Sequence, residues 1–451
     1  PVPALAASWT ASDDQLHWEL KLRPDAAFSD GTSVTSTDVK ATLERIARKD
    51  SGSSVSDLLE LVTGYRSVAV DGTATELAGV VAATPDLLRI ELDSPWASLP
   101  SALANPAFGV LPKALAEATT FPAIDQASSL VTSGPFRMSK ASSNRLTMVP
   151  ASGVESASRQ LDFVLHDDKA ASYDALVAGM VDWSEVPPDR VDEAVERFGR
   201  SLFRPYVAEL FYAFNLRNPK FADVRFREAL VRAVDRQSII TEVYDSTVRP
   251  MEGVIVEGLA GAQSDPCGGR CDYDPDRARA LLAEITAEGA VVPELQIDFE
   301  DDATQTAVAN AIKDDLAAVG INATLRPKPL ADYQQFAVTG EQELFRLGWI
   351  APYPSADGIL PPLFQTGFPN NLTGFSSAAV DELLRSARAE PSAAARTTRF
   401  QEAERAVLGE LPIIPIAQFE IQSVAAKRVR GLVVTATGTF DGRTVSVAPA
   451  G

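Results

Sequence analysis

The stretch that most constrains the fold runs from residue 294 to residue 327. ELQIDFE alternates apolar and polar residues, which is typical of a half-buried strand. Apolar residues then recur at helical spacing (Val308, Ile312 and Leu316) as far as Gly320, and INATLRP is typical of a second strand. Strand, helix and strand within about thirty residues make a βαβ unit. We therefore predict two parallel strands joined by a right-handed crossover.

A further helical pattern at 331–338 leads into a strand that ends in GWIAPYPSAD, residues 348–357. Two prolines and two aromatic residues crowd the exit from that strand. Ligands of open α/β sheets bind outside the carboxyl ends of the strands. This segment is therefore predicted to be the lip of a binding site rather than only a stiff turn.

The rest of the chain divides into blocks with different periodicities. Strand patterns dominate 5–112 and 124–208, whereas helical patterns dominate the block that starts at residue 209. One long helix is predicted at 223–244, with Asp223 as its N-cap. The contrast predicts at least two lobes with a crevice between them, a preferred place for a small-molecule site.

Composition narrows the function. The net charge of −20 repels phosphate backbones, so nucleic acid is not an expected partner. Only two histidines occur, His17 and His166, which argues against His-dependent catalytic triads and multi-His metal sites. The glycine-rich motifs that cradle nucleotides are missing, as is an apolar run of the ~18 residues that a membrane span needs. We therefore predict no catalytic residue, no metal ligand and no cofactor.

The two cysteines, Cys267 and Cys271, lie in the sequence DPCGGRCDYD. The two glycines between them would let the loop close a small disulfide ring, and two cysteines without a nearby histidine cannot form a four-ligand zinc site. A disulfide is favoured over free thiols, and it would indicate an exported protein.

Several segments, in their order and spacing from Leu5 to the C-terminus, together resemble one family. It is the peptide/nickel class of extracytoplasmic solute-binding proteins of ABC importers, which includes the oligopeptide- and dipeptide-binding proteins. The segments are LAASWTASDDQLHWELKLRPDAAFSDGTSVTSTDVKATLERI, ALANPAFGVLPK, TSGPFRM, ALVAGMVDW, YAFNLRNPKFADVRFREALVRAVDR, YDPDRARALL, FRLGWIAPYPSADGIL and LPIIPI.

The resemblance implies an α/β fold of the two-lobe periplasmic-binding-protein type (type II, cluster C), with an extra N-terminal subdomain and mixed sheets flanked by helices. Residues 1–123 would form that subdomain, 124–208 with 419–451 the core of lobe 1, and 209–418 lobe 2. A solute would be captured between the lobes and delivered to permease subunits, without catalysis. The family also implies a monomer outside the cytoplasm, held on the outer face of the membrane by a lipid anchor that is not in this chain.

The chain departs from the family in two ways. Members usually carry some tens of residues ahead of LAASW, so contacts made by that segment cannot be named here. Peptide binders of the family often carry an aspartate three residues after the tryptophan of the G-W pair, and that acid pairs with the peptide α-ammonium. Here the position is Pro352, which forms no ion pair, and Asp357 in the same loop is the candidate replacement.

Ten residues are candidates for solute contact. Alternative interpretations remain for three of them: Trp349 could belong to the core, Tyr353 could brace the turn, and Asp357 could cap a helix. The candidates are Trp349, Tyr353, Asp357, Asn371, Ser133, Gly134, Phe214, Asn215, Trp96 and Asn105.

The predicted solute is an oligopeptide or a peptide-like molecule. A binder of another solute, such as a metal chelate, haem or a glycoside, is the first alternative. The second is a cell-envelope interaction protein that has reused the fold without transport. A hydrolase would need a nucleophile and a base that the sequence does not offer.

Overall fold

The structure is a computed structural model, and it describes residues 2–118 and 130–448. The chain forms two compact units. Unit 1 comprises Pro1–Pro187, Glu193–Leu202 and Ser423–Gly451, and unit 2 comprises Pro188–Asp192 and Phe203–Gln422.

The boundaries between the units lie close to the predicted lobe boundaries. Unit 2, however, begins before residue 209 and continues past residue 418. Strand β9 (Arg204–Phe214) pairs with β14 (Ile413–Ile421) as far as Ile421 opposite Arg204. A boundary at 209 would cut this pairing, which is why both strands lie in unit 2. The boundary predicted at 123 lies outside the described residues, and the extra subdomain stays a prediction.

Unit 1 begins with a four-stranded antiparallel sheet in the order β1-β2-β4-β3. Helix α1 (Ser36–Ala47) packs on it and starts at Ser36, because Thr35 and Asp38 form a reciprocal capping box. The strands are β1 (Ala6–Ala11), β2 (His17–Leu22), β3 (Val80–Thr84) and β4 (Leu87–Glu91).

The remaining strands of unit 1 form three small antiparallel sheets. One of them pairs β8 with β15. The segment that follows unit 2 in the sequence therefore pairs with a strand that precedes unit 2. The strands are β5 (Phe136–Ala141), β6 (Arg145–Pro150), β7 (Leu161–Val164), β8 (Trp183–Glu185), β15 (Ser423–Ala425), β16 (Val429–Arg430) and β17 (Ser446–Val447). The other helices of this part of the chain are α2 (Leu99–Leu103), α3 (Lys113–Ala116), α4 (Lys169–Val177) and α5 (Val191–Phe198).

Unit 2 is built on a six-stranded mixed sheet in the order β10-β14-β9-β13-β11-β12. Strand β11 runs parallel to both β12 and β13, and α9 (Ala303–Ala318) connects β11 to β12. The parallel βαβ unit predicted from the sequence is therefore confirmed. The strands not yet given are β10 (Arg249–Pro250), β11 (Leu295–Glu300), β12 (Ala323–Lys328) and β13 (Leu344–Ile350).

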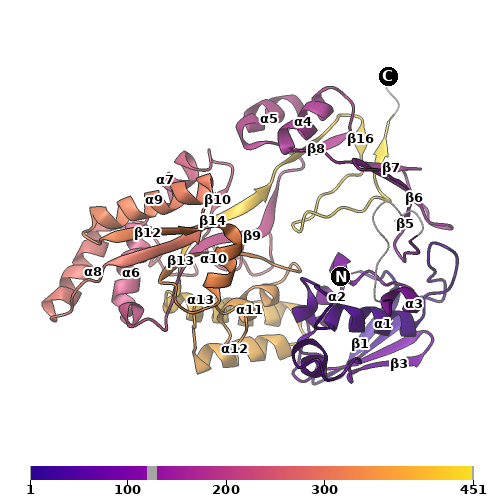
Figure 1. Cartoon of the computed structure of the whole chain (residues 1–451), viewed down its shortest axis with the longest axis horizontal. Helices are drawn as coiled ribbons and strands as arrows, with labels where there is room; N and C mark the ends of the chain where they lie inside the picture. The colour runs from indigo at the N-terminus through magenta and orange to yellow at the C-terminus, as the bar shows by residue number, and fades with distance from the viewer. Residues whose placement is uncertain (1, 119–129, 449–451) are drawn as a thin grey trace. The chain divides into compact units, whose positions relative to one another are not determined.

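Helices cover both faces of this sheet, with α7 and α9 on one side and α11, α12 and α13 on the other (Figure 1). Double cover explains why residues 207–214 of β9, at the centre of the sheet, are all buried and nearly all apolar. The helices of unit 2 are α6 (Val224–Ala233), α7 (Arg236–Glu242), α8 (Pro275–Ala287), α10 (Leu330–Ala337), α11 (Leu360–Phe364), α12 (Ala378–Ala389) and α13 (Ala393–Gly409).

The single helix predicted at 223–244 is wrong, because the structure has two helices there. Helix α6 ends at Ala233, Val234 is extended, and the side chain of Asp235 caps α7 by accepting from the backbone N–H of Ser238. The apolar pattern continues through the break because Val234 stays buried between the two helices. The apolar periodicity therefore predicted correctly that Val234 is buried, but it did not reveal that Asp235 starts a new helix.

The predicted disulfide between Cys267 and Cys271 is present, and both residues are buried. Within the described residues, no helix combines the length and the apolar character that crossing a membrane requires.

Gly348 is predicted to be essential for the position of β13. A Cβ atom on this residue would lie 2.8 Å from the backbone oxygen of Glu209 and 3.7 Å from Cζ of Arg346. Gly348→Ala should therefore lower the free energy of unfolding by about 1–3 kcal/mol, the usual cost of overpacking, in urea denaturation. Gly409→Ala is the control, since nothing lies within 4 Å of a Cβ there. Equal stability of the two variants would contradict the prediction.

Candidate functional site

The carboxyl ends of β11, β12 and β13 meet at one edge of the sheet of unit 2, because these strands are parallel. The segment 351–358 leaves β13 at that edge, as the sequence predicted. Its conformation is fixed from within. The indole Nε1 of Trp349 donates to the backbone oxygen of Gly358 at 2.7 Å, which ties the strand to the far end of the loop.

The carboxylate of Asp357 is fully buried and is held by the protein itself. Arg388 on α12 donates to its Oδ1 at 2.6 Å, and the hydroxyl of Tyr353 donates to its Oδ2 at 3.1 Å. Asp357 lies within a short 3-10 turn whose N-cap is Ser355, so it is not the cap of that turn. The cation that pairs with Asp357 is therefore Arg388 of the protein itself. This pair, with Tyr353, fixes the loop that follows β13.

Three more candidates are equally engaged in the framework of unit 2. The side chain of Asn371 donates to the backbone oxygens of Gln365 and Phe375, at 3.1 and 2.8 Å. Asn215 donates to two backbone oxygens at 2.8 Å each, and the ring of Phe214 is fully buried. Phe214 is paired with Leu344, the first residue of β13, so Phe214 and Asn215 lie at the opposite edge of the sheet from the loop that follows β13.

The other four candidates belong to unit 1. Trp96 is buried, and Asn105 caps a short 3-10 turn by accepting from the backbone N–H of Ala107 at 2.9 Å. Ser133 donates to the backbone oxygen of Val110 at 2.8 Å, and Gly134 is exposed. The ten candidates therefore fall into a set of six in unit 2 and a set of four in unit 1.

A cluster of polar side chains that the sequence analysis missed lies on the other face of β13. Arg346 lies directly opposite Tyr212 of β9, and its Nε is 3.3 Å from Oε1 of Glu300, the last residue of β11. Nε of Arg346, Oε2 of Glu300 and the hydroxyl of Tyr212 are all buried without a hydrogen-bond partner among the residues that the structure describes. We call these three residues the Arg346 cluster.

Two tyrosines and a glutamine surround the Arg346 cluster. The hydroxyl of Tyr333 on α10 donates to the backbone oxygen of Arg346, and Tyr244 lies beside Gln305 in the first turn of α9. Burial raises the pKa of the Tyr212 hydroxyl well above its usual value, with Tyr333 adding to the effect, so this group is neutral and can donate. A charged residue within the strand FRLGWI was the signal that could have found the cluster.

Two buried glutamates lie on the face of the sheet that carries Trp349. Glu209, directly opposite Trp349, is fully buried, and neither of its carboxylate oxygens accepts a hydrogen bond in the described structure. Burial, and then the neighbouring charge of Glu404 on α13, raises its pKa well above the usual value. Glu404 accepts from the backbone N–H of Ile255 and from Gln263, yet burial still raises its pKa to about 7.

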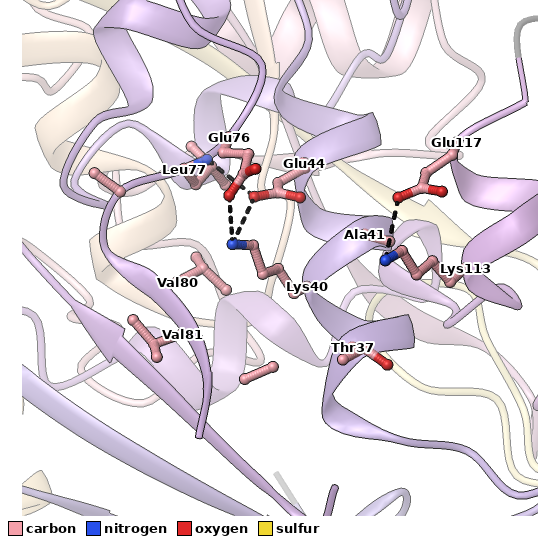
Figure 2. Close-up of a pocket in the computed structure, with 12 residues that line it drawn as sticks. Thr37, Lys40, Ala41, Glu44, Glu76, Leu77, Val80, Val81, Lys113 and Glu117 are labelled. Carbon is pink, nitrogen blue, oxygen red and sulfur yellow. Dashed lines mark hydrogen bonds and ion pairs between the residues drawn. The ribbon is translucent and has the colours of Figure 1, made fainter. Parts of the chain in front are cut away.

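A cavity of about 410 Å³ also lies in unit 1, between α1, β3 and α3 (Figure 2). Its two lysines are matched by acidic residues on its own wall. Lys40 is 2.8 Å from Glu76, and Lys113 is 3.6 Å from Glu117. The wall therefore presents no uncompensated positive charge, and we assign it no ligand.

No group of three or more potential metal ligands of the His, Cys, Asp and Glu types lies together in residues 2–118 and 130–448. The structure thus supplies a buried polar cluster and a rigid loop at the carboxyl edge of a sheet. The model of the bacterial extracellular solute-binding proteins, family 5, matches residues 1–371.

The chain belongs to this family.

Curated relatives of this family 5 protein match over almost its whole length. The dipeptide-binding protein DppE of Bacillus subtilis (strain 168) is 23% identical over 98% of this chain and 83% of its own. The periplasmic murein peptide-binding protein MppA of Escherichia coli (strain K12) is 24% identical over 93% of this chain and 80% of its own.

Solved structures agree on the fold. The unliganded open form of the periplasmic murein tripeptide binding protein MppA superposes with a TM-score of 0.83 at 22% identity, covering 99% of this chain and 88% of the other. The binding protein AgaA of A. tumefaciens R10 in complex with agropinic acid gives a TM-score of 0.75 at 22% identity, with coverage of 100% and 90%. The predicted fold class of this family 5 protein is thereby confirmed.

The first prediction from the site concerns the buried ion pair. Arg388→Ala leaves the carboxylate of Asp357 buried without its cation, so the free energy of unfolding should fall by about 3–5 kcal/mol. Arg385→Ala, on the same helix, is the control, because Arg385 and its partner Glu382 are exposed and their pair should contribute little. Urea denaturation measures both, and a loss of stability no greater for Arg388→Ala than for Arg385→Ala would be the contrary result.

The second prediction concerns pH. The pKa of Glu404 in the folded chain, about 7, lies above the usual 4.5, so its protonation stabilises the fold below pH 4.5 and that contribution is lost as the pH rises through 7. Between pH 5 and pH 8.5, Glu404→Gln should therefore gain stability relative to the parent protein, by about 3 kcal/mol at most.

Glu402→Gln is the matched control, because Glu402 lies on the same helix but is exposed. Urea denaturation at the two pH values measures all three proteins. The same pH dependence in the parent protein and in Glu404→Gln would contradict the assignment.

Proposed function

We propose that this protein is the extracytoplasmic binding component of an ABC importer. It captures a short peptide or a peptide-like solute and delivers it to the permease subunits. Family membership supports this proposal, as do relatives named for dipeptide, murein peptide and oligopeptide binding. Capture between the two predicted lobes requires only that the solute binds the closed form better than the open form, so it involves no catalysis.

The observation that carries the proposal is the Arg346 cluster. Buried polar groups without partners are rare in folded proteins, because each one costs free energy. Here an oxygen of Glu300 and the hydroxyl of Tyr212 are left in this state at the carboxyl edge of parallel strands, which is where α/β sheets bind ligands. A solute that supplies the missing hydrogen bonds would be bound selectively.

The ten residues selected from the sequence keep supporting or contacting roles in this proposal. Trp349 is half-buried and offers an aromatic surface beside the loop, and Tyr353 and Asp357 hold that loop rigid. A loop fixed before binding loses less conformational entropy on binding, which raises affinity.

We further propose that the protein acts as a monomer on the outer face of the cytoplasmic membrane, held there by a lipid anchor. The disulfide supports an oxidising compartment outside the cytoplasm.

A non-peptide solute is the alternative. A protein of the same fold was solved with agropinic acid, and the acid common among peptide binders of the family is replaced here by Pro352. The fold alone therefore does not select the peptide class.

Thermal unfolding in the presence of solutes tests the proposal. Ligand that binds only the native state stabilises it by RT ln(1+[L]/Kd), about 2.7 kcal/mol at a hundredfold excess over Kd. We expect at least one member of a library of di- to pentapeptides to raise the melting temperature in proportion to the logarithm of its concentration.

A library of metal chelates, haem, glycosides and opine-like acids serves as the comparison. A rise with this second library alone would replace the peptide assignment by the alternative. No rise with either library would overturn the proposed transport function.

A further inference from the structure

The central strands β9 and β14 carry the sheet of unit 2 into unit 1. Strand β9 begins at Arg204, next to Phe203, where unit 2 resumes, and β14 ends at Ile421, next to Gln422, where unit 2 ends. The strands are antiparallel with Ile421 opposite Arg204, so these two crossings of the chain lie side by side. Movement of one unit against the other is absorbed at the ends of elements such as these.

The backbone ladder between β9 and β14 is broken next to the crossings. Gln418 lies opposite Glu209, but the next paired residue of β14, Glu420, lies opposite Pro205. One residue of β14 therefore faces three residues of β9, 206–208. Such an irregularity leaves backbone groups without a ladder partner, and a buried backbone group without a partner costs free energy.

The side-chain amide of Gln418 fills this gap. Its Nε2 donates to the backbone oxygen of Tyr206 at 3.1 Å and to that of Glu257 at 2.8 Å. Its Oε1 accepts from the backbone N–H of Glu257 at 2.9 Å. Residue 257 thus exchanges both hydrogen bonds with the amide, as paired residues of neighbouring antiparallel strands do. Gln418 is only 3% exposed, so water does not compete for these bonds.

The segment that carries Glu257 is itself held at two points. The backbone N–H of Ile255 donates to the carboxylate of Glu404 on α13 at 2.6 Å. Arg249 of β10 lies 2.7 Å from Glu257 and 2.9 Å from Glu420, the residue at which the ladder resumes. Gln418 therefore connects the crossing strands to a support that is anchored on a helix and on a neighbouring strand.

We propose that Gln418 is a positioning residue for solute capture. Its amide replaces the missing ladder bonds, fixes the spacing of β9 and β14 at their crossings and thereby limits the movement of the two units against each other. This inference rests on the proposed function, because capture requires an open and a closed form. Crossings that are mobile in the free protein would add conformational entropy that solute binding must remove, which lowers affinity.

Gln418→Met tests the proposal, because methionine is similar in size and removes all three hydrogen bonds of the amide. Gln401→Met is the matched control. The amide of Gln401, on α13, donates to the backbone oxygen of Gly261 at 3.1 Å, so it holds the same loop but bonds to neither β9 nor β14.

Double electron–electron resonance measures the movement in the free protein, with one spin label at Met180 of unit 1 and one at Val291 of unit 2. Both residues are exposed, and attachment through non-natural amino acids leaves the disulfide intact. We expect a broader distribution of distances in Gln418→Met than in the parent protein or in Gln401→Met. An unchanged distribution would overturn the proposal.

Isothermal titration calorimetry with dialanine, trialanine and tetraalanine supplies the second readout. For each of these peptides that binds the parent protein, Kd should rise by about fivefold or more in Gln418→Met, the effect of one hydrogen bond of ordinary net strength, and by less than about twofold in Gln401→Met. A merely structural role would lower the melting temperature of Gln418→Met and leave its Kd unchanged. A broader distribution with an unchanged Kd would therefore also overturn the proposal.

Arg249→Met keeps the test decisive if Gln418→Met does not fold. The side chain of Arg249 is 43% exposed, so its replacement leaves no buried gap, yet it removes the link between Glu257 and Glu420. The distance distribution should broaden and Kd should rise, both by less than in Gln418→Met. The absence of both changes would count against the proposal.

Failure of the proposed function gives a different result. If none of the three peptides binds the parent protein, the peptide assignment is contradicted, and the distance distributions alone decide the role of Gln418. If the peptides bind all variants with one Kd and the distributions are also the same, the positioning role falls and the peptide-binding function stands.

Discussion

The arrangement of unit 2 depends on the pairing of β9 with β13 on one side and with β14 on the other. Backbone hydrogen bonds fix the register, which places Arg346 opposite Tyr212 and Trp349 opposite Glu209. Successive side chains of a strand point to opposite faces, so one register sends the first pair to one face and the second pair to the other. A slip by one residue would exchange them and bury a different set of charges.

Burial of charge imposes the second constraint. Removing an ion from water is costly unless a partner replaces the lost hydration. Unit 2 meets this requirement with residues far apart in the chain, as in the pairs Asp357 with Arg388 and Asp298 with Arg326. Glu209 meets it through a raised pKa, which favours its neutral form. Glu300 differs from these residues, because Arg346 lies near only one of its oxygens and the other is buried without a hydrogen-bond partner in the described structure.

Sequence patterns predicted much of the framework because their signals are local. The cap at Asp223 was visible as a short polar residue ahead of apolar periodicity, and the structure uses it. The break after Ala233 was missed because Val234 continues the apolar pattern while its backbone is extended. A buried apolar residue at helical spacing usually belongs to the helix, but Val234 is buried without being helical.

The position of the loop after β13 was predicted from the sequence, but the polar partners of the candidate side chains were not. The loop after β13 lies at the carboxyl edge as expected, yet Asp357 serves the internal structure of this loop, and Asn371 serves that of the segment 365–375. Their partners Arg388 and Phe375 could not be assigned from spacing, because a side chain's polar partner depends on tertiary packing. Arg346 escaped notice for the converse reason, since in the sequence it only interrupts an apolar run.

The sequence by itself determined the resemblance to the family, the parallel βαβ unit and the close spacing of the two cysteines. These follow from local periodicity, capping and composition. Only the tertiary structure decided that Glu300, Tyr212 and Arg346 lie together and that Asp357 belongs to Arg388. The physical reason is that electrostatic and hydrogen-bonding partners are selected by distance in space, and strand register sets those distances between residues that are far apart in the chain.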